Sequence, residues 1–200
     1  MTPLFRAELK ERLFVHYVGG RWLAPLSMET VPAVEVPEVG TCVAVCARTD
    51  DVRRARAALR PTRDWPLSAG LSAVTAARAL EGYDDPAEGP APLPELPGRD
   101  GPLVLLSAAC APVSILIGIL RAGAARGVLW KPAPGAAASA HALVETLQPA
   151  LGASVALLQG DHHSGALTAA CGDLIWASPA AVPVGLHAAL ILASTAPRRR

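Results

Sequence analysis

The chain of 200 residues suits one domain, or one domain with a small extension, and its 52% hydrophobic content is ample for a buried core. The formal net charge of +1 argues against non-specific nucleic-acid binding, which needs clustered cations, and an aromatic content of 4% leaves few side chains on which bases could stack. The basic run Arg198–Arg200 is expected to be a solvated tail.

The N-terminal part, residues 1–83, is predicted to form a small β/α unit. A charged helical lead-in covers about the first 12 residues, and Gly19-Gly20 joins two short strands in a hairpin. A second extended pair and two helices follow. The strands are predicted at Phe14–Val18, Arg21–Leu23, Val31–Val36 and Cys42–Ala47, and the helices at Asp51–Leu59 and Leu71–Leu80.

Residues 84–102 are rich in proline, glycine and acidic residues and show no hydrophobic periodicity. This composition predicts an extended, solvated linker. The most probable internal boundary of the chain is therefore expected here.

From residue 103 to 197, short apolar runs alternate with alanine-rich helical stretches, which predicts a parallel sheet with crossover helices. The fold class is thus α/β, with a Rossmann-like sheet of four or five strands beside the N-terminal hairpin and helix unit. The strands are predicted at Leu103–Ser107, Val128–Trp130, Val155–Leu158 and Asp173–Trp176, with a further strand or helix in Gly185–Ala193. The helices are predicted at about Val113–Arg126, Gly135–Leu147 and Ser164–Ala170.

The uncharged segment Leu103–Leu120 is long enough to be considered as a membrane span. Pro112 divides it and Arg121 ends it, so a buried strand followed by a buried helix is the favoured interpretation and no membrane is expected. The charged residues Glu8–Arg12 precede any apolar stretch, which is unlike a signal peptide. A cytoplasmic location is therefore expected.

The cysteines lack the paired spacing of a zinc site, and all four are expected to be small core residues in a reducing compartment. Cys110 stands at a predicted strand-to-helix turn, where a reactive thiol is the alternative to a packed one. The four are Cys42, Cys46, Cys110 and Cys171.

Lys131 is one of two lysines in the chain and stands where a predicted strand becomes a loop. A lysine in that place invites an anionic or hydroxyl-rich ligand, and an ordinary lysine at the end of a loop is the alternative. Trp130 and Trp176 end neighbouring strands and are expected in the core or in a pocket wall.

The segment Gly160–Gly165 (GDHHSG) allows three interpretations. His162 and His163 would point to opposite sides of an extended segment, which disfavours a metal site, and neighbours in sequence cannot chain the hydrogen bonds of a Ser-His-Asp triad. A glycine-bounded loop at a strand end is favoured. No catalytic and no metal-binding residue is expected in the chain.

Five segments, in this order, resemble the aldehyde dehydrogenase superfamily. The first two are HYVGGRWLAP and TVPAVEVPEVGTCVAVCARTDDVRRARAAL, and Trp65 falls where that family tends to place a tryptophan. The later ones are ILRAGAARGVLWKPAPGAAASAHALVETL, VALLQGD and DLIWAS.

The resemblance implies a Rossmann-like domain that holds NAD or NADP across the ends of its strands. Lys131 would then meet the adenosine ribose or a phosphate on it, and the other cofactor-binding residues are expected to be Pro132, Gly160, Gly165 and Ser178. Cofactor binding is expected to be weak or lost, because the family's ribose-binding acid is Pro134 here and Pro179 removes a backbone N–H.

The resemblance also implies that the chain lacks the catalytic half of the family, whose members are more than twice as long. The family's oxyanion-stabilising asparagine is replaced within Ser107–Cys110, Cys171 precedes the fourth strand, and no glutamate follows Glu145 to serve as a base. The expected function is a non-catalytic partner or regulatory subunit that works with a full-length paralogue or a second copy of itself. The alternative is an NAD(P)-binding subunit of an aldehyde oxidoreductase that another chain completes.

Overall fold

The structure of the protein is a computed structural model that describes residues 13–37, 39–63, 70–84, 95–98 and 101–192. The predicted helical lead-in over the first 12 residues, Trp65 and the basic run Arg198–Arg200 lie outside the described residues. Most of the predicted linker, residues 84–102, lies outside them too, so the division of the chain into two units stays a prediction.

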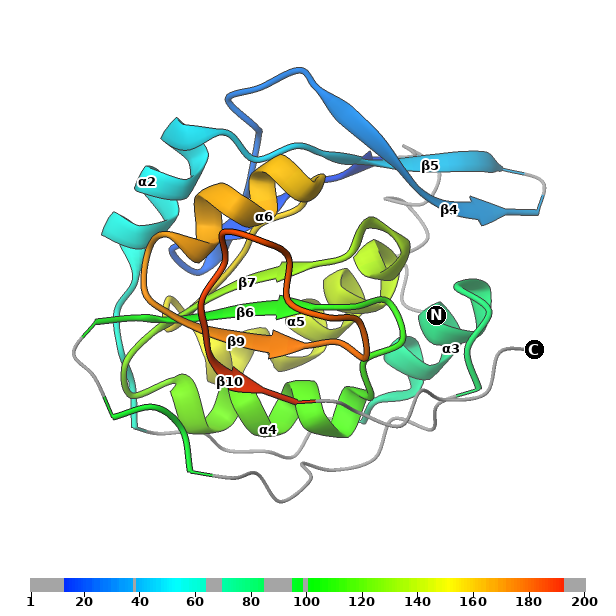
Figure 1. Ribbon diagram of the computed structural model, residues 1–200. Helices are drawn as coiled ribbons and strands as arrows, with labels where there is room; N and C mark the ends of the chain where they lie inside the picture. The colour runs from blue at the N-terminus through cyan, green and yellow to red at the C-terminus, as the bar shows by residue number, and fades with distance from the viewer. Residues whose placement is uncertain (1–12, 38, 64–69, 85–94, 99–100, 193–200) are drawn as a thin grey trace.

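Five neighbouring parallel strands, in the order β10-β9-β6-β7-β8, belong to a seven-stranded sheet in which β10 is one edge (Figure 1). The strand order reverses at β6, as it does in doubly wound α/β folds. The segment Gly185–Ala193, for which strand and helix were both open, contains a strand parallel to β9. The bounds are β6 Leu103–Ser107, β7 Val128–Pro132, β8 Val155–Leu157, β9 Asp173–Ala177 and β10 Ala188–Ile191.

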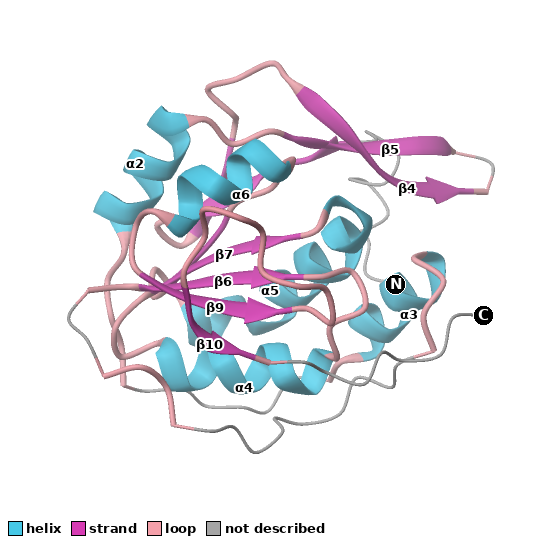
Figure 2. Cartoon of the chain, viewed as in Figure 1, coloured by secondary structure: helices cyan, strands magenta, loops and turns pink. Residues whose placement is uncertain are grey.

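Helices cover both faces of this sheet (Figure 2). In β6, Leu103 and Leu105 belong to the core that includes α3, α4 and α5, while Val104 and Leu106 belong to the core that includes α2. Both faces are therefore buried, which explains why this strand is a continuous apolar run. Figure 1 shows α2 and α6 above the sheet and α4 below it. The helices are α2 Thr49–Ala58, α3 Ser72–Leu80, α4 Val113–Gly123, α5 Ala137–Leu151 and α6 His162–Ala169.

The uncharged segment Leu103–Leu120 is divided between β6 and α4, as predicted. None of the helices in the described part of the chain has the length and apolar character that a membrane span requires.

The N-terminal hairpin joins the main sheet instead of standing apart from it. Its strands, β2 His16–Val18 and β3 Arg21–Leu23, are antiparallel around Gly19 and Gly20, whose positive φ angles of 62° and 83° fit a tight two-residue turn. Tyr17 of β2 pairs with Leu157 of β8, so the hairpin extends the sheet at that edge.

The second extended pair is confirmed as an antiparallel hairpin in a separate three-stranded sheet, in the order β1-β5-β4. Its strands are β1 Leu13–Phe14, β4 Thr30–Val36 and β5 Gly40–Val45. Cys42 and Cys46 are buried as predicted, whereas Cys110 and Cys171 are only half-buried.

A buried polar cluster fixes the hairpin to the loop that follows β8. The Nδ1 atom of His16 accepts a hydrogen bond of 3.1 Å from the backbone N–H of Gln159. Burial lowers the pKa of His16 to about 4, and the nearby Asp51 only partly opposes this effect. His16 is thus neutral at physiological pH and can serve as the acceptor.

Several predicted boundaries are wrong by two to four residues, among them the end of α4, which is at Gly123 instead of Arg126. β7 continues through Lys131 and Pro132, and these two residues pair with β6 only. Because β8 ends opposite Trp130, Pro132 has no neighbour on that side that needs a hydrogen bond from its backbone. Proline therefore does not end this strand. Helix α5 continues to Leu151, four residues beyond the predicted end, and α6 begins two residues early, at His162.

Gly172 allows the start of β9 to approach the start of β6. A Cβ atom at residue 172 would lie 2.1 Å from the carbonyl oxygen of Pro102, a backbone atom that cannot move without displacing β6. We expect Gly172→Ala to lower the free energy of unfolding by about 1–3 kcal/mol in urea denaturation. Gly70→Ala is the matched control, because no atom lies within 4 Å of its Cβ position; equal effects of the two changes would contradict the expectation.

Candidate functional site

A cavity of about 660 Å³ lies at the carboxyl ends of β6, β7 and β9. It is placed where the strand order reverses, because the chain leaves β6 through α4 on one face and reaches β9 through α6 on the other. The loops after these strands diverge there and leave a crevice, the usual ligand position in open α/β sheets. Residues 106–109 form one wall, and residues from the loop between β9 and β10 form another.

Lys131 lies in this cavity as a buried cation, with only 6% of its surface exposed. Burial lowers the pKa of its ammonium group to about 8, an effect that the negative charge of Asp161 only partly opposes. Among the described residues no hydrogen bond or ion pair to this group is found. A buried ammonium group without a direct partner is unfavourable for folding, which points to a ligand that neutralises it.

The structure brings three of the five predicted cofactor-binding residues together and leaves two aside. Lys131, Gly165 and Ser178 line the cavity. Pro132 belongs to β7, where it pairs with Ser107 of β6, and Gly160 precedes the N-cap residue of α6; neither is among the lining residues. Gly160 has φ of +136°, and a Cβ atom there would lie 2.2 Å from the Ser164 hydroxyl oxygen, which gives this glycine a structural role.

The segment Gly160–Gly165 is the beginning of a helix, which corrects the loop interpretation. The Asp161 carboxylate accepts hydrogen bonds of 2.9 Å from the backbone N–H and the hydroxyl of Ser164 and so caps α6. Burial tends to raise the pKa of Asp161, but these hydrogen bonds and Arg48 hold it well below its usual range. The aspartate followed by serine three residues later was the sequence signal for this helix start.

The two tryptophans fulfil the roles expected of them. Trp130 is fully buried and its indole N–H donates to the Ser107 hydroxyl at 3.0 Å. Trp176 lines the cavity, and its indole N–H donates to the carbonyl of Ala180 at 2.7 Å, which shapes the loop after β9. The Ser178 hydroxyl accepts from the backbone N–H of Ala180 at 3.1 Å.

A buried ion pair on α3 contacts the loops of the cavity, and sequence reasoning missed it. Arg78 donates to the carbonyl of Ala109, while Glu81 accepts from the backbone N–H of Ser139 at 2.8 Å. Arg78 and Glu81 are three residues apart in a helix, a spacing typical of exposed pairs, so the sequence carried no signal for their burial.

The residues that line the cavity are mostly apolar. Its polar lining consists of one cation, two serine hydroxyls and His162, and no cysteine or carboxylate occurs among its described lining residues. Cys110 belongs to the loop after β6 but does not line the cavity. Within the described ranges no cluster of three histidine, cysteine or acidic residues could hold a metal ion.

Comparison with known proteins identifies the fold. No family model and no curated protein matches the sequence. Among solved structures, an NAD+ complex of an aldehyde dehydrogenase from Bacillus cereus matches 88% of this chain with 14% identity and a TM-score of 0.60. A Δ-pyrroline-5-carboxylate dehydrogenase from Mycobacterium tuberculosis matches 87% with 17% identity and a TM-score of 0.59. An NAD-dependent aldehyde dehydrogenase from Sinorhizobium meliloti matches 84% with 15% identity and a TM-score of 0.58.

These matches cover 48%, 45% and 46% of the three enzymes, so the chain spans about half their length. The chain therefore has the aldehyde dehydrogenase fold over that half, which confirms, for the fold, the resemblance seen in the sequence.

Proposed function

We propose that this chain binds NAD or NADP, with the adenosine half of the dinucleotide in the cavity and the Lys131 ammonium group at its ribose. The observation that carries the proposal is a buried lysine at the point where the strand order of a parallel sheet reverses. A cation in that place offers a point-charge partner to ribose hydroxyls or to a phosphate on the ribose. The fold shared with an NAD+ complex from Bacillus cereus supports the same ligand class.

The size and lining of the cavity fit this ligand. A volume of about 660 Å³ lies within the range of small-molecule sites, and alanine, proline and tryptophan side chains offer apolar walls to a base. Since no carboxylate among the described lining residues can accept from a ribose hydroxyl, the 2′-phosphate of NADP suits the lysine better than the free diol of NAD.

We further propose that the chain acts as a non-catalytic partner or regulatory subunit, with a full-length paralogue or a second copy of itself as its companion. An edge strand and two exposed apolar side chains support this role. β10 ends the sheet, Ile191 in it is 57% exposed, and Val184 in the preceding loop is fully exposed. An open strand edge with apolar neighbours favours pairing with another chain.

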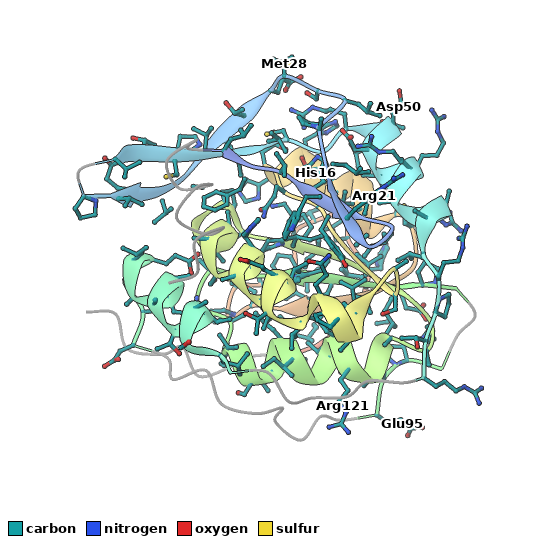
Figure 3. The ribbon with its side chains drawn as sticks, turned by 180° about the vertical axis from the view of Figure 1, so that it is seen from behind. His16, Arg21, Met28, Asp50, Glu95 and Arg121 are labelled. Carbon is teal, nitrogen blue, oxygen red and sulfur yellow. The ribbon has the colours of Figure 1, made fainter. Side chains whose placement is uncertain are left out.

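Replacement of Lys131 tests the site. We expect Lys131→Met to abolish NADP binding in isothermal titration calorimetry and to stabilise the fold by about 2 kcal/mol, because it removes the cost of burying a charge. The melting temperature then rises by roughly 4–8 °C. Arg121→Met is the control, since Arg121 points outward from α4 (Figure 3) and neither property should change. Retained NADP binding in Lys131→Met would refute the assignment.

Above pH 8 we expect the affinity for NADP to fall with rising pH and the stability of the ligand-free protein to increase. The Lys131 ammonium group loses its proton above about pH 8 in the folded protein, so NADP affinity falls by roughly tenfold between pH 7.5 and 9.5. The unfolded chain keeps this proton up to about 10.5, so the stability of the ligand-free protein rises over the window from 8 to 10.5. Titration calorimetry of the unaltered protein measures the first trend, and urea denaturation compared with Lys131→Met measures the second; a flat affinity profile would contradict the first.

The partner role is tested by the mass in solution and by co-purification from the native source. We expect a species heavier than one chain, which the double change Val184→Lys and Ile191→Lys reduces to a monomer. Met28→Lys is the control, because Met28 is also exposed and lies at the periphery of the molecule, away from β10 (Figure 3). A monomer that co-purifies with no other protein would argue against the partner role, and it would not bear on the proposal of nucleotide binding.

A further inference from the structure

Arg78 of α3 and Glu81, the residue that directly follows α3, form an ion pair that is almost completely buried. The side chains of Arg78 and Glu81 are 2% and 0% exposed, and their nearest charged atoms are 3.5 Å apart. The guanidinium carbon of Arg78 lies 4.3 Å from the centre of the Tyr83 ring, which fixes the guanidinium group from its other side. A buried ion pair contributes little net stability, because removing both charges from water costs free energy. The contacts that the pair makes therefore say more about its role than its contribution to stability does.

Arg78 binds the backbone of a cavity loop, and Glu81 binds the backbone at the start of α5, the helix that follows the other cavity loop. Arg78 donates to the carbonyl of Ala109, a cavity-lining residue of the loop after β6. Glu81 accepts a hydrogen bond of 2.8 Å from the backbone N–H of Ser139, in the first turn of α5. That turn follows directly on Ala133 and Pro134, which line the cavity at the end of β7. The pair thus connects the two loops from outside the cavity.

The two loops are already in close contact at the floor of the cavity. The backbone N–H of Ala133 donates to the carbonyl of Ser107 at 2.7 Å. A Cβ atom on Gly135 would lie 3.6 Å from the Cβ of Ala109, which is ordinary van der Waals contact. Because the two loops are in contact, a small displacement of either loop changes the positions of the cavity-lining residues that it carries.

The charge on Glu81 is sensitive to pH near neutrality. Burial raises the pKa of Glu81 to about 7, although hydrogen bonds from Ser139 and the charge of Arg78 oppose the change. The ionised carboxylate holds both Arg78 and the Ser139 N–H, and protonation weakens both interactions. The other titratable groups on the described segments around α3 are His141 and Glu145 on α5, Glu35 on β4, Cys110 in the loop after β6, and Tyr83 and Asp84 directly after α3.

We propose that Arg78 and Glu81 are a positioning pair, which sets the spacing of the two cavity loops and makes ligand affinity depend on the ionisation of Glu81. Neither residue touches the cavity, and both act through Ala109 and Ser139. The identity of the ligand rests on the proposed function, whereas the response of the loops to pH does not.

The loop response is measured on the unaltered protein by NMR. We expect the amide resonances of Ser139 and of the loop around Ala109 to titrate together between pH 6 and 8, with one shared midpoint near 7. In Glu81→Gln these shifts should disappear, and in Glu95→Gln, which changes an exposed glutamate at the periphery (Figure 3), they should remain. Amides that do not titrate, or that titrate equally in Glu81→Gln, would overturn the proposal.

The consequence for affinity is measured with NAD, which has no phosphate monoester that titrates in this range. We expect NAD affinity to fall by about tenfold from pH 8 to pH 6 in the unaltered protein and in Glu95→Gln, and to vary little in Glu81→Gln. The cavity residues Lys131 and His162 are the same in all three proteins, so the comparison isolates the effect of the change at residue 81. A variant that was only destabilised would lower the melting temperature and keep the pH slope.

The two proposals fail in different ways. If neither NAD nor NADP binds while the amides of the two loops titrate, the proposed function is wrong and the positioning pair stands. If NAD binds with a slope that Glu81→Gln does not change, the positioning pair is wrong and the proposed function stands.

Discussion

The pairing of β6 with β7 on one side and β9 on the other is the constraint on which the site depends. Leu103–Ser107 pairs residue by residue with Val128–Pro132 and with Asp173–Ala177, so all three strands end at the same level. The crossovers on the two sides of β6 run over opposite faces, which separates the loops at these ends. The position of the cavity therefore follows from the order and connections of the strands, and the side chains determine which ligands fit it.

The side chains make the cavity roomy and leave one charge in it. Alanine at residues 108, 109, 133 and 166 adds little volume to the walls, and Gly165 brings α6 close to Lys131, with its Cβ position 3.9 Å from the lysine Cδ. Asp161, the acid whose charge acts on Lys131, caps α6 and pairs with Arg48. Among the described residues Lys131 is thus buried without a direct ionic partner.

The local pattern of the sequence predicted the elements well and their surroundings poorly. Apolar runs located four of the five parallel strands, because a strand that is buried on both faces consists of apolar residues. For the segment that contains β10 the sequence left strand and helix both open. The predicted end of β7 was wrong because the effect of Pro132 depends on the length of the neighbouring strand β8, which local sequence does not give.

The burial of Arg78 and Glu81 could not be predicted for the same reason. Their hydrogen-bond partners, Ala109 and Ser139, are distant in sequence. Lys131 was found because a lysine is rare in this chain and follows an apolar strand.

Lys131 in the cavity and Glu81 outside it respond to pH in opposite directions. Lys131 is charged below about pH 8, and Glu81 is charged above about pH 7. Both are charged together only in the interval between these values, where the cation is present and the loops beneath it are held by the ionised pair. Burial is the cause in each case, because it disfavours the charged form of acid and base alike. Under the proposed function, the packing around Lys131 and Glu81 therefore matches ligand binding to near-neutral pH.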